Sequence, residues 1–185
     1  MNEFNFANAV LLEKSITVPS TQTGLFAKRE LVFEKILSFF NKRPIDIFQV
    51  GAIETFNARW YYGSGWSDLF WGAYIKKYGG SITIIDINLD HIANSKFAAS
   101  CMDYEITCVL GDAENEIAKK NYDLYYLDGS NSSEETANQF KKITATTCTV
   151  LVDDYDIKGN GLHDYGFIRD GSFSGGMGIL RKENG

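Results

Sequence analysis

The chain has 185 residues, 44% of them hydrophobic, and a formal net charge of -6 at pH 7. This length suits a single domain over residues 1–185, with residues 1–27 forming an N-terminal arm or lid. The acidic balance disfavours nucleic acid as a partner, because such binding requires clustered Lys and Arg. The sequence lacks a secretory signal and an apolar stretch of roughly 18 residues, the length of a membrane span. We therefore expect a cytoplasmic protein without a membrane partner.

The N-terminal half alternates helical and extended patterns. Apolar residues at helical spacing predict a helix over Lys28–Phe40, and a second helix follows Gly65 and ends at Gly79-Gly80. A third helix is expected over about Leu89–Ala99, and a short one over Ala113–Lys120. Between them, continuous apolar runs predict strands buried on both faces. These runs are Asp46–Gly51, Ile82–Asp86 and Ile106–Asp112.

The C-terminal half continues the alternation and then changes. Leu124–Gly129 and Val150–Asp154 are further strand runs, and a helix from Ser132 toward Ala145 separates them. Residues 156–164 are expected to form a loop because they are rich in glycine and polar side chains. Two last strands, Tyr165–Arg169 and Met177–Lys182, are joined through turn residues and predict an antiparallel ending.

This order predicts an α/β fold, a three-layer sandwich around a mostly parallel, doubly wound sheet with an antiparallel C-terminal strand. Each of the five strand runs ends in glycine or a carboxylate, at the edge where open α/β sheets bind ligands. The three cysteines, Cys101, Cys108 and Cys148, form no Cys-x-x-Cys pair. Cys108 and Cys148 flank or lie in strand runs, so we expect buried, reduced thiols there.

The strand ends carry the candidate binding residues. A dinucleotide-binding loop would place Gly-x-Gly-x-x-Gly after the first strand, but only Gly51 stands there. Gly63-Ser64-Gly65-Trp66-Ser67 follows later and directly precedes a helix. Asp86 could accept hydrogen bonds from two ribose hydroxyls, or could simply be a solvated strand end. Asp112 could contact the amine of an adenine, or could cap the helix that follows it.

Six short segments occur in order: Val50-Gly51, Gly63-Ser64-Gly65-Trp66-Ser67, Ile85-Asp86-Ile87, Gly111-Asp112-Ala113, Tyr126-Leu127-Asp128-Gly129-Ser130 and Val152-Asp153-Asp154-Tyr155. In this order they resemble class I S-adenosylmethionine-dependent methyltransferases over roughly Ile45 to Lys182. More narrowly, they resemble the small-molecule O-methyltransferases related to macrocin and catechol methyltransferases and to cephalosporin-hydroxylase-type proteins. The resemblance implies a Rossmann-like methyltransferase fold, S-adenosylmethionine as cofactor, and O-methylation of a small hydroxylated molecule.

The resemblance also implies roles for individual residues. The cofactor-binding residues would be Gly51, Gly65, Ser67, Asp86, Ile87, Asp112, Ala113 and Asp128. Asp128 would also face the sulfonium and the substrate, as a catalytic residue. In metal-dependent members, carboxylates ending the fourth and fifth strands bind a divalent cation, and here Asp128, Asp153 and Asp154 match those positions. Oxygen ligands suit Mg²⁺, which lowers the cost of ionising a substrate hydroxyl.

The chain departs from its relatives after the fourth strand. Relatives often carry Asp-Gly-Asp-His or a nearby lysine, whereas this chain has Asp128-Gly129-Ser130-Asn131. His163 follows the fifth strand in the expected loop and is a candidate base for a hydroxyl proton, although a loop histidine needs no role. His91 is expected on the surface of a helix.

Three alternatives remain open. The first is a non-catalytic module that binds S-adenosylmethionine or a nucleotide, and the second is a nicotinamide-dependent oxidoreductase, against which the missing glycine motif argues. The third is a protein-interaction domain that uses the N-terminal arm. Homo-oligomerisation is a further possibility, because the chain has few extra segments from which to build a substrate pocket.

Overall fold

The structure is a computed structural model that describes residues 35–54, 67–130, 132–159, 162, 168–169 and 178–182. The predicted arm or lid at 1–27 and the candidate residues Gly65 and His163 lie outside these residues. In the described part, residues 35–38 are helical, within the helix expected over Lys28–Phe40.

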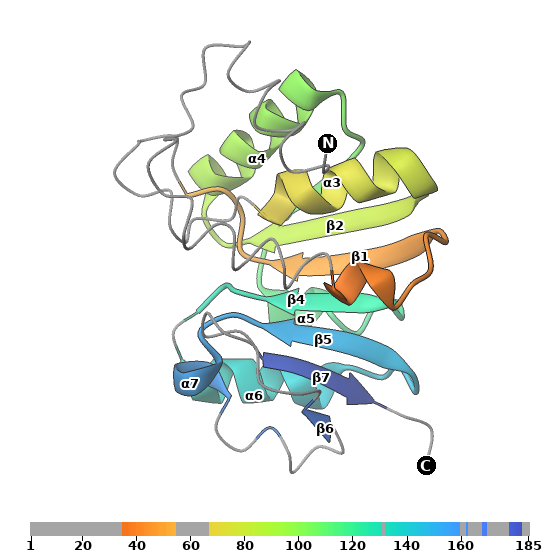
Figure 1. Cartoon of the computed structure of the whole chain (residues 1–185). Coiled ribbons are helices and arrows are strands. Elements are labelled where there is room, and N and C mark those ends of the chain that lie inside the picture. Colours follow the sequence, from red (N-terminus) through yellow and green to blue (C-terminus); the bar gives the residue numbers. More distant parts are fainter. Residues whose placement is uncertain are drawn as a thin grey trace, which may run out of the picture.

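Strands and helices alternate along the described chain (Figure 1). The strands are β1 (Ile45–Val50), β2 (Gly80–Asp86), β3 (Thr107–Leu110), β4 (Leu124–Leu127), β5 (Cys148–Val152), β6 (Ile168–Arg169) and β7 (Gly178–Lys182). The helices are α3 (Ser67–Tyr78), α4 (Leu89–Met102), α5 (Ala113–Glu116), α6 (Ser133–Lys142) and α7 (Tyr155–Lys158).

The described strands form one seven-stranded sheet in the order β3-β2-β1-β4-β5-β7-β6. The pairs among β1 to β5 are parallel, whereas β7 runs antiparallel to both β5 and β6. The chain thus starts in the middle of the sheet, winds to the β3 edge, and then returns to build the other half. This arrangement confirms the predicted doubly wound sheet with an antiparallel C-terminal strand.

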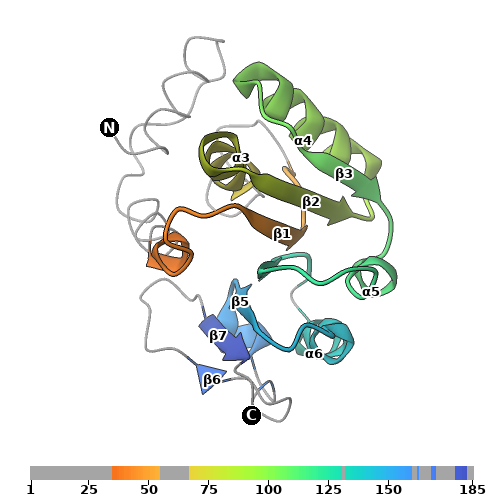
Figure 2. The same ribbon diagram turned by 90° about the vertical axis from the view of Figure 1, so that its right-hand side faces the viewer.

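Successive strand residues point to opposite faces of the sheet, and each face has its own apolar core. Ile47 and Tyr126 pack on one face with Trp71 of α3 and Ile92 of α4. On the other face, Phe48, Tyr125 and Val150 pack with Phe140 of α6. Figure 2 shows α3 and α4 on one side of the sheet and α5 and α6 on the other. Burial on both faces explains why these strands are continuously apolar.

Three sequence-based expectations need correction. Residues 156–164 were expected to form a loop, but the described part of this segment begins with α7, whose four residues are too few to show a helical period. The helix expected over Ala113–Lys120 is shorter, because α5 ends at Glu116. Cys108 was expected to be buried, but it is only partly buried, since β3 is an edge strand.

The three cysteines are free thiols, and Cys148 is buried as expected. Burial raises the pKa of the Cys108 thiol to about 11, which keeps it protonated and weakly reactive at neutral pH. Among the described residues, no helix is both long enough and apolar enough to cross a membrane.

The parallel strands end almost level with one another. Val50 of β1 pairs in register with Ile85 of β2 and with Leu127 of β4, and Leu127 pairs with Val152 of β5. The residue that follows each of these strand positions therefore lies at the same edge of the sheet. Those residues are Gly51, Asp86, Asp128 and Asp153.

Candidate functional site

A pocket lies at this edge, between the ends of β1, β2, β3 and β4. Its volume is about 90 Å³, well below the roughly 300–1,000 Å³ of pockets that enclose a whole drug-sized ligand. It can therefore take only one portion of such a ligand. Five of the predicted binding residues line it: Gly51, Asp86, Ile87, Asp112 and Ala113. Gly129, Ser130, Glu135 and Gln139 are among the other lining residues.

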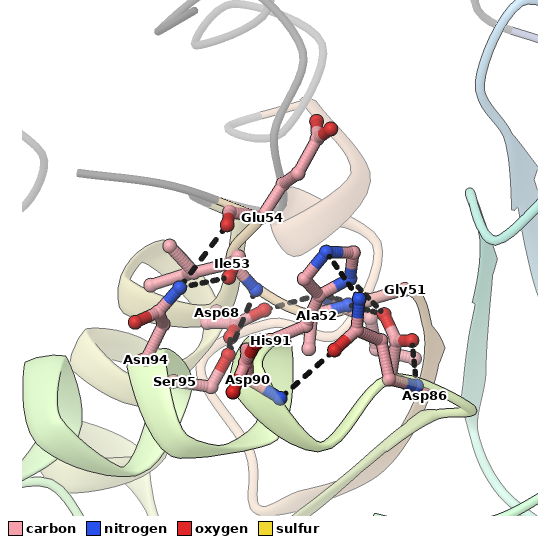
Figure 3. Close-up of polar contacts among 12 residues, drawn as sticks. Gly51, Ala52, Ile53, Glu54, Asp68, Asp86, Asp90, His91, Asn94 and Ser95 are labelled. Atoms are coloured by element: carbon pink, nitrogen blue, oxygen red, sulfur yellow. Dashed lines mark hydrogen bonds and ion pairs between the residues drawn. The ribbon is translucent and has the colours of Figure 1, made fainter. Parts of the chain in front are cut away.

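Asp86 is held in place by hydrogen bonds from three directions. Its Oδ1 accepts from the backbone N–H of Asn88 (2.8 Å), and its Oδ2 accepts from the N–H of Ala52 (3.0 Å). The Nδ1 atom of His91 also lies 3.0 Å from Oδ2. An ionised carboxylate has about four acceptor positions, so about one is left for a ligand. Figure 3 shows this carboxylate between His91 and the loop after β1.

The other side of the pocket is formed by the start of α5. The Asp112 side chain accepts a hydrogen bond from the N–H of Glu114 (2.9 Å) and is the N-cap of this helix. The capping interpretation of Asp112 is thus confirmed, while a contact with a base stays a prediction. Ala113 is buried, and 81% of the Ile87 surface is exposed at the pocket rim. These two residues give the pocket apolar surface beside its carboxylates.

The loop directly after β1 is anchored by side chains from α4. The Ser95 hydroxyl accepts a hydrogen bond from the N–H of Ile53 (2.9 Å). The Asn94 amide donates to the carbonyls of Ile53 and Glu54, each at 3.1 Å (Figure 3). The N–H groups of Ala52 and Ile53 are therefore occupied within the protein. In a glycine-rich nucleotide loop, by contrast, such N–H groups bind the ligand.

Below this loop lies a buried polar network of four residues that the sequence did not indicate. Gln49, near the carboxyl end of β1, donates to the Gly51 carbonyl (2.7 Å) and to Asp68, and accepts from the Ser67 hydroxyl (3.1 Å). Asp68 also accepts from the Ser95 hydroxyl. Burial raises the pKa of Asp68 to about 8, and the hydrogen bonds from Ser95 and Gln49 offset this only in part. Asp68 is thus mainly protonated at neutral pH, and the network braces α3 against the loop.

The carboxylate cluster, which we define as Asp128, Asp153 and Asp154, lies at the ends of β4 and β5. One oxygen from each residue lies within 4.8 Å of the others. The Tyr126 hydroxyl joins two members, at 3.2 Å from Asp128 Oδ2 and 3.3 Å from Asp153 Oδ2. The structure therefore brings together the three predicted metal ligands.

Lys158 of α7 completes this cluster. Its side chain is only 2% exposed, and its Nζ lies 3.2 Å from Asp128 Oδ1 and 3.8 Å from Asp154 Oδ2. The sequence suggested that a nearby lysine was missing because none follows β4 directly. The lysine comes instead from another element, and its contact with Asp128, which is 30 residues away, depends on how that element packs.

The described candidate residues thus fall into three groups. Gly51, Asp86, Ile87, Asp112 and Ala113 line the pocket, the carboxylate cluster lies beside it, and Ser67 belongs to the buried polar network. His91 was expected on a helix surface, and it does lie on α4, but it also contacts Asp86. Its position five residues after Asp86, on the next helix, is the signal that could have suggested this contact.

Comparison with known proteins adds the fold class. No protein-family model matches the chain, and no curated protein matches its sequence. Solved structures do match it. The putative methyltransferase yhhF from Escherichia coli superposes with a TM-score of 0.62 at 14% identity, over 90% of this chain and 90% of that one. The chain has the Rossmann-like methyltransferase fold.

Two further structures support this assignment. The ribosomal protein L11 methylase from Lactobacillus delbrueckii subsp. bulgaricus matches with a TM-score of 0.59 and 14% identity, over 89% of this chain and 80% of that chain. A point mutant of MtNAS in complex with S-adenosylmethionine matches with a TM-score of 0.59 and 12% identity, over 98% of this chain and 75% of that chain. At such identities the likeness establishes the methyltransferase fold alone.

Proposed function

We propose that this protein is an S-adenosylmethionine-dependent methyltransferase that transfers a methyl group to a hydroxyl oxygen of a small molecule. The observation that carries the proposal is that Gly51, Asp86 and Asp112, far apart in sequence, line one pocket at the carboxyl edge of the sheet. Ligands of open α/β sheets bind at this edge. The fold supports the same function, since one similar solved structure is a complex with S-adenosylmethionine.

The pocket would take the adenosine portion of the cofactor. The remaining acceptor position of Asp86 would bind a ribose hydroxyl, and the carboxylate is already oriented by Ala52, Asn88 and His91. Ala113 and Ile87 would border the adenine with apolar surface. The methionine portion would extend past Gly51 and Gly129 toward Asp128. Gly65 and Ser67 are proposed near the methionine carboxylate, although Ser67 already donates its proton to Gln49.

The chemistry is an in-line displacement at the sulfonium methyl group. The methyl carbon–sulfur bond breaks as a carbon–oxygen bond forms, and the thioether leaves as S-adenosylhomocysteine. The acceptor hydroxyl passes its proton to a base, for which Asp128 and His163 are the candidates. Such a reaction depends on positioning the two reactants in a desolvated site. Asp128 is 10% exposed and lies beside the pocket, so its carboxylate could accept a hydrogen bond from the acceptor hydroxyl. His163 stays a predicted base.

Divalent-cation dependence fits this site less well than cofactor binding does. Three carboxylates are ligands of the kind that Mg²⁺ prefers. However, the Lys158 ammonium already contacts Asp128 and Asp154. The cluster does not fit a divalent cation while this ammonium is in place, and no step of the proposed reaction passes through a metal. The sequence-based expectation of Mg²⁺ at Asp128, Asp153 and Asp154 is therefore not part of the proposed function.

Isothermal titration calorimetry with S-adenosylmethionine, S-adenosylhomocysteine and NAD tests the proposal. We expect saturable binding of the two sulfur nucleosides and none of NAD. Asp86→Asn should weaken that binding about 10-fold or more, because a charged hydrogen-bond acceptor is lost. The matched control is Asp90→Asn, which removes an exposed carboxylate four residues away.

Two other outcomes would favour the alternatives. Binding of NAD, or of neither sulfur nucleoside by folded protein, would reject the proposal. Binding without S-adenosylhomocysteine formation, over a panel of catechols, sugars and other hydroxylated acceptors, would instead favour a non-catalytic binding module.

A further inference from the structure

Lys158 is an unusual residue for the position it occupies. Lysine is almost never fully buried unless it is paired, and here the side chain is 2% exposed. Its Nζ lies 3.2 Å from Asp128 Oδ1, a charge-assisted hydrogen bond, and 3.8 Å from Asp154 Oδ2. The ammonium thus lies among the carboxylates of the carboxylate cluster.

The backbone after β5 places it there. Asp154 has a left-handed conformation with φ 48° and ψ 45°, which turns the chain sharply into α7. Within that short helix, the N–H of Lys158 donates to the Asp154 carbonyl at 3.0 Å. Residues four apart lie on the same side of a helix, so the Lys158 side chain extends over the Asp154 carboxylate. A left-handed non-glycine residue carries a conformational cost, and such residues often occur at functional sites.

The charges of the cluster require a cation. Three carboxylates within 4.8 Å of one another repel strongly in a partly buried site. The Tyr126 hydroxyl donates its single hydrogen between Asp128 and Asp153, but it is neutral and does not compensate their charge. The ammonium of Lys158 supplies positive charge to the cluster through its ion pairs with Asp128 and Asp154.

We propose that Lys158 is the built-in cation of the carboxylate cluster and occupies the place that a divalent metal ion would take. A metal ion would have to displace the buried ammonium, so the native protein should bind divalent cations weakly and work without them. Lys158 would also act as a positioning residue, because its contact with Oδ1 fixes the rotamer of Asp128. The cation part of this inference is independent of the proposed function. Only the positioning of Asp128 toward an acceptor hydroxyl rests on that function.

Titration with metal alone tests this inference, and it needs no methyl donor. MgCl₂, MnCl₂ and CaCl₂ are titrated into the full chain and two variants, with calorimetry and thermal unfolding as readouts. In Lys158→Met the ammonium is replaced by an apolar chain of similar length, and we expect divalent-cation affinity to rise at least about 10-fold. Lys158→Arg keeps the positive charge and should bind metal as weakly as the wild type.

A control separates this effect from the change in net charge. Lys119→Met removes an ammonium that pairs with Glu116 on the exposed surface, and it should leave metal affinity unchanged. Micromolar Mg²⁺ binding by the wild type would overturn the inference, and this measurement remains decisive even if Lys158→Met does not fold. Equal metal affinity of wild type and folded Lys158→Met, including no binding by either, would also overturn it.

The positioning role has a separate readout. If the wild type methylates an acceptor, the rate should be unchanged by EDTA, and Lys158→Arg should recover part of the activity that Lys158→Met loses. Inhibition by EDTA with restoration by Mg²⁺ would overturn the inference while leaving the methyltransferase proposal intact. Conversely, absence of S-adenosylmethionine binding would reject the proposed function without affecting the metal titrations.

Discussion

At the scale of single residues, the site depends on carboxylates in contrasting environments. Asp86 accepts hydrogen bonds from two backbone N–H groups and contacts His91, so its side chain is held from several sides. Asp68 is completely buried, which favours its protonated form, and the hydrogen bonds that it accepts from Ser95 and Gln49 offset this only in part. Two aspartates of the same region therefore differ in burial and in hydrogen-bond partners.

The raised pKa of Asp68 predicts a pH dependence of stability. Its pKa rises from 3.8 to about 8 on folding, so its stabilising contribution is complete below pH 3.8 and is lost as the pH rises through 8. Between these values, the free energy of unfolding should fall by up to about 1.4 kcal/mol per pH unit from this group. Asp68→Asn, which mimics the neutral form, should flatten this slope.

Urea denaturation from pH 5 to pH 8 measures the slope in both proteins. Asp90→Asn is the control, because it removes an exposed carboxylate of the neighbouring helix and should leave the slope unchanged. Identical slopes for wild type and Asp68→Asn would show that Asp68 is ionised in the folded protein.

At the scale of elements, the strands could be predicted and the contacts between elements could not. The runs that became β1, β2, β4 and β5 are apolar because both faces of the sheet are covered, and this property is local. The short helix α7 has no period to detect, and the position of Lys158 depends on the turn at Asp154. Asp68 lies in the first turn of α3, where exposed carboxylates are common, so its position along the chain does not reveal its burial.

The same distinction applies to the candidate site. Parallel strands end at one edge, so the alignment of Gly51, Asp86 and Asp128 followed from the predicted topology. Asn94 and Ser95 form hydrogen bonds with the loop after β1 because α4 packs beside that loop. No spacing along the chain reveals this packing.

The junction between the loops after β1 and β4 gives a prediction at this scale. Gly51 has φ +94°, and a Cβ there would lie 2.9 Å from the carbonyl oxygen of Asp128. Gly51→Ala should therefore destabilise the protein by about 1–3 kcal/mol through backbone strain and separation of the two loops. The free energy of unfolding in urea is the measurement.

Gly111→Ala is the matched control for that measurement. Its Cβ would meet no described atom closer than the Cδ1 of Ile85 at 3.8 Å, an ordinary van der Waals contact. This variant should unfold close to wild type. If both variants lost equal stability, the close approach at Gly51 would not be the cause.

At the scale of the whole molecule, the sheet has a rigid centre and a less protected edge. Every residue of β4 and β5 is buried, whereas the edge strand β3 has partly or fully exposed residues throughout. Native-state hydrogen exchange should therefore be slowest at the amides of β4 and much faster at those of β3. Peptide-level mass spectrometry under native conditions checks this, and equal protection of the two strands would contradict it.

The loops after β1 and β4 pack closely where the pocket at the strand ends adjoins the carboxylate cluster. A Cβ on Gly129 would lie 2.4 Å from Val50 Cγ1, just as one on Gly51 would collide with Asp128. Under the proposed function, this close packing would hold the spacing between a donor bound in the pocket and an acceptor bound at the cluster. Acceptors would then be selected by reach as well as by chemistry, since a hydroxyl held too far from the donor carbon could not be brought closer by a rotamer change.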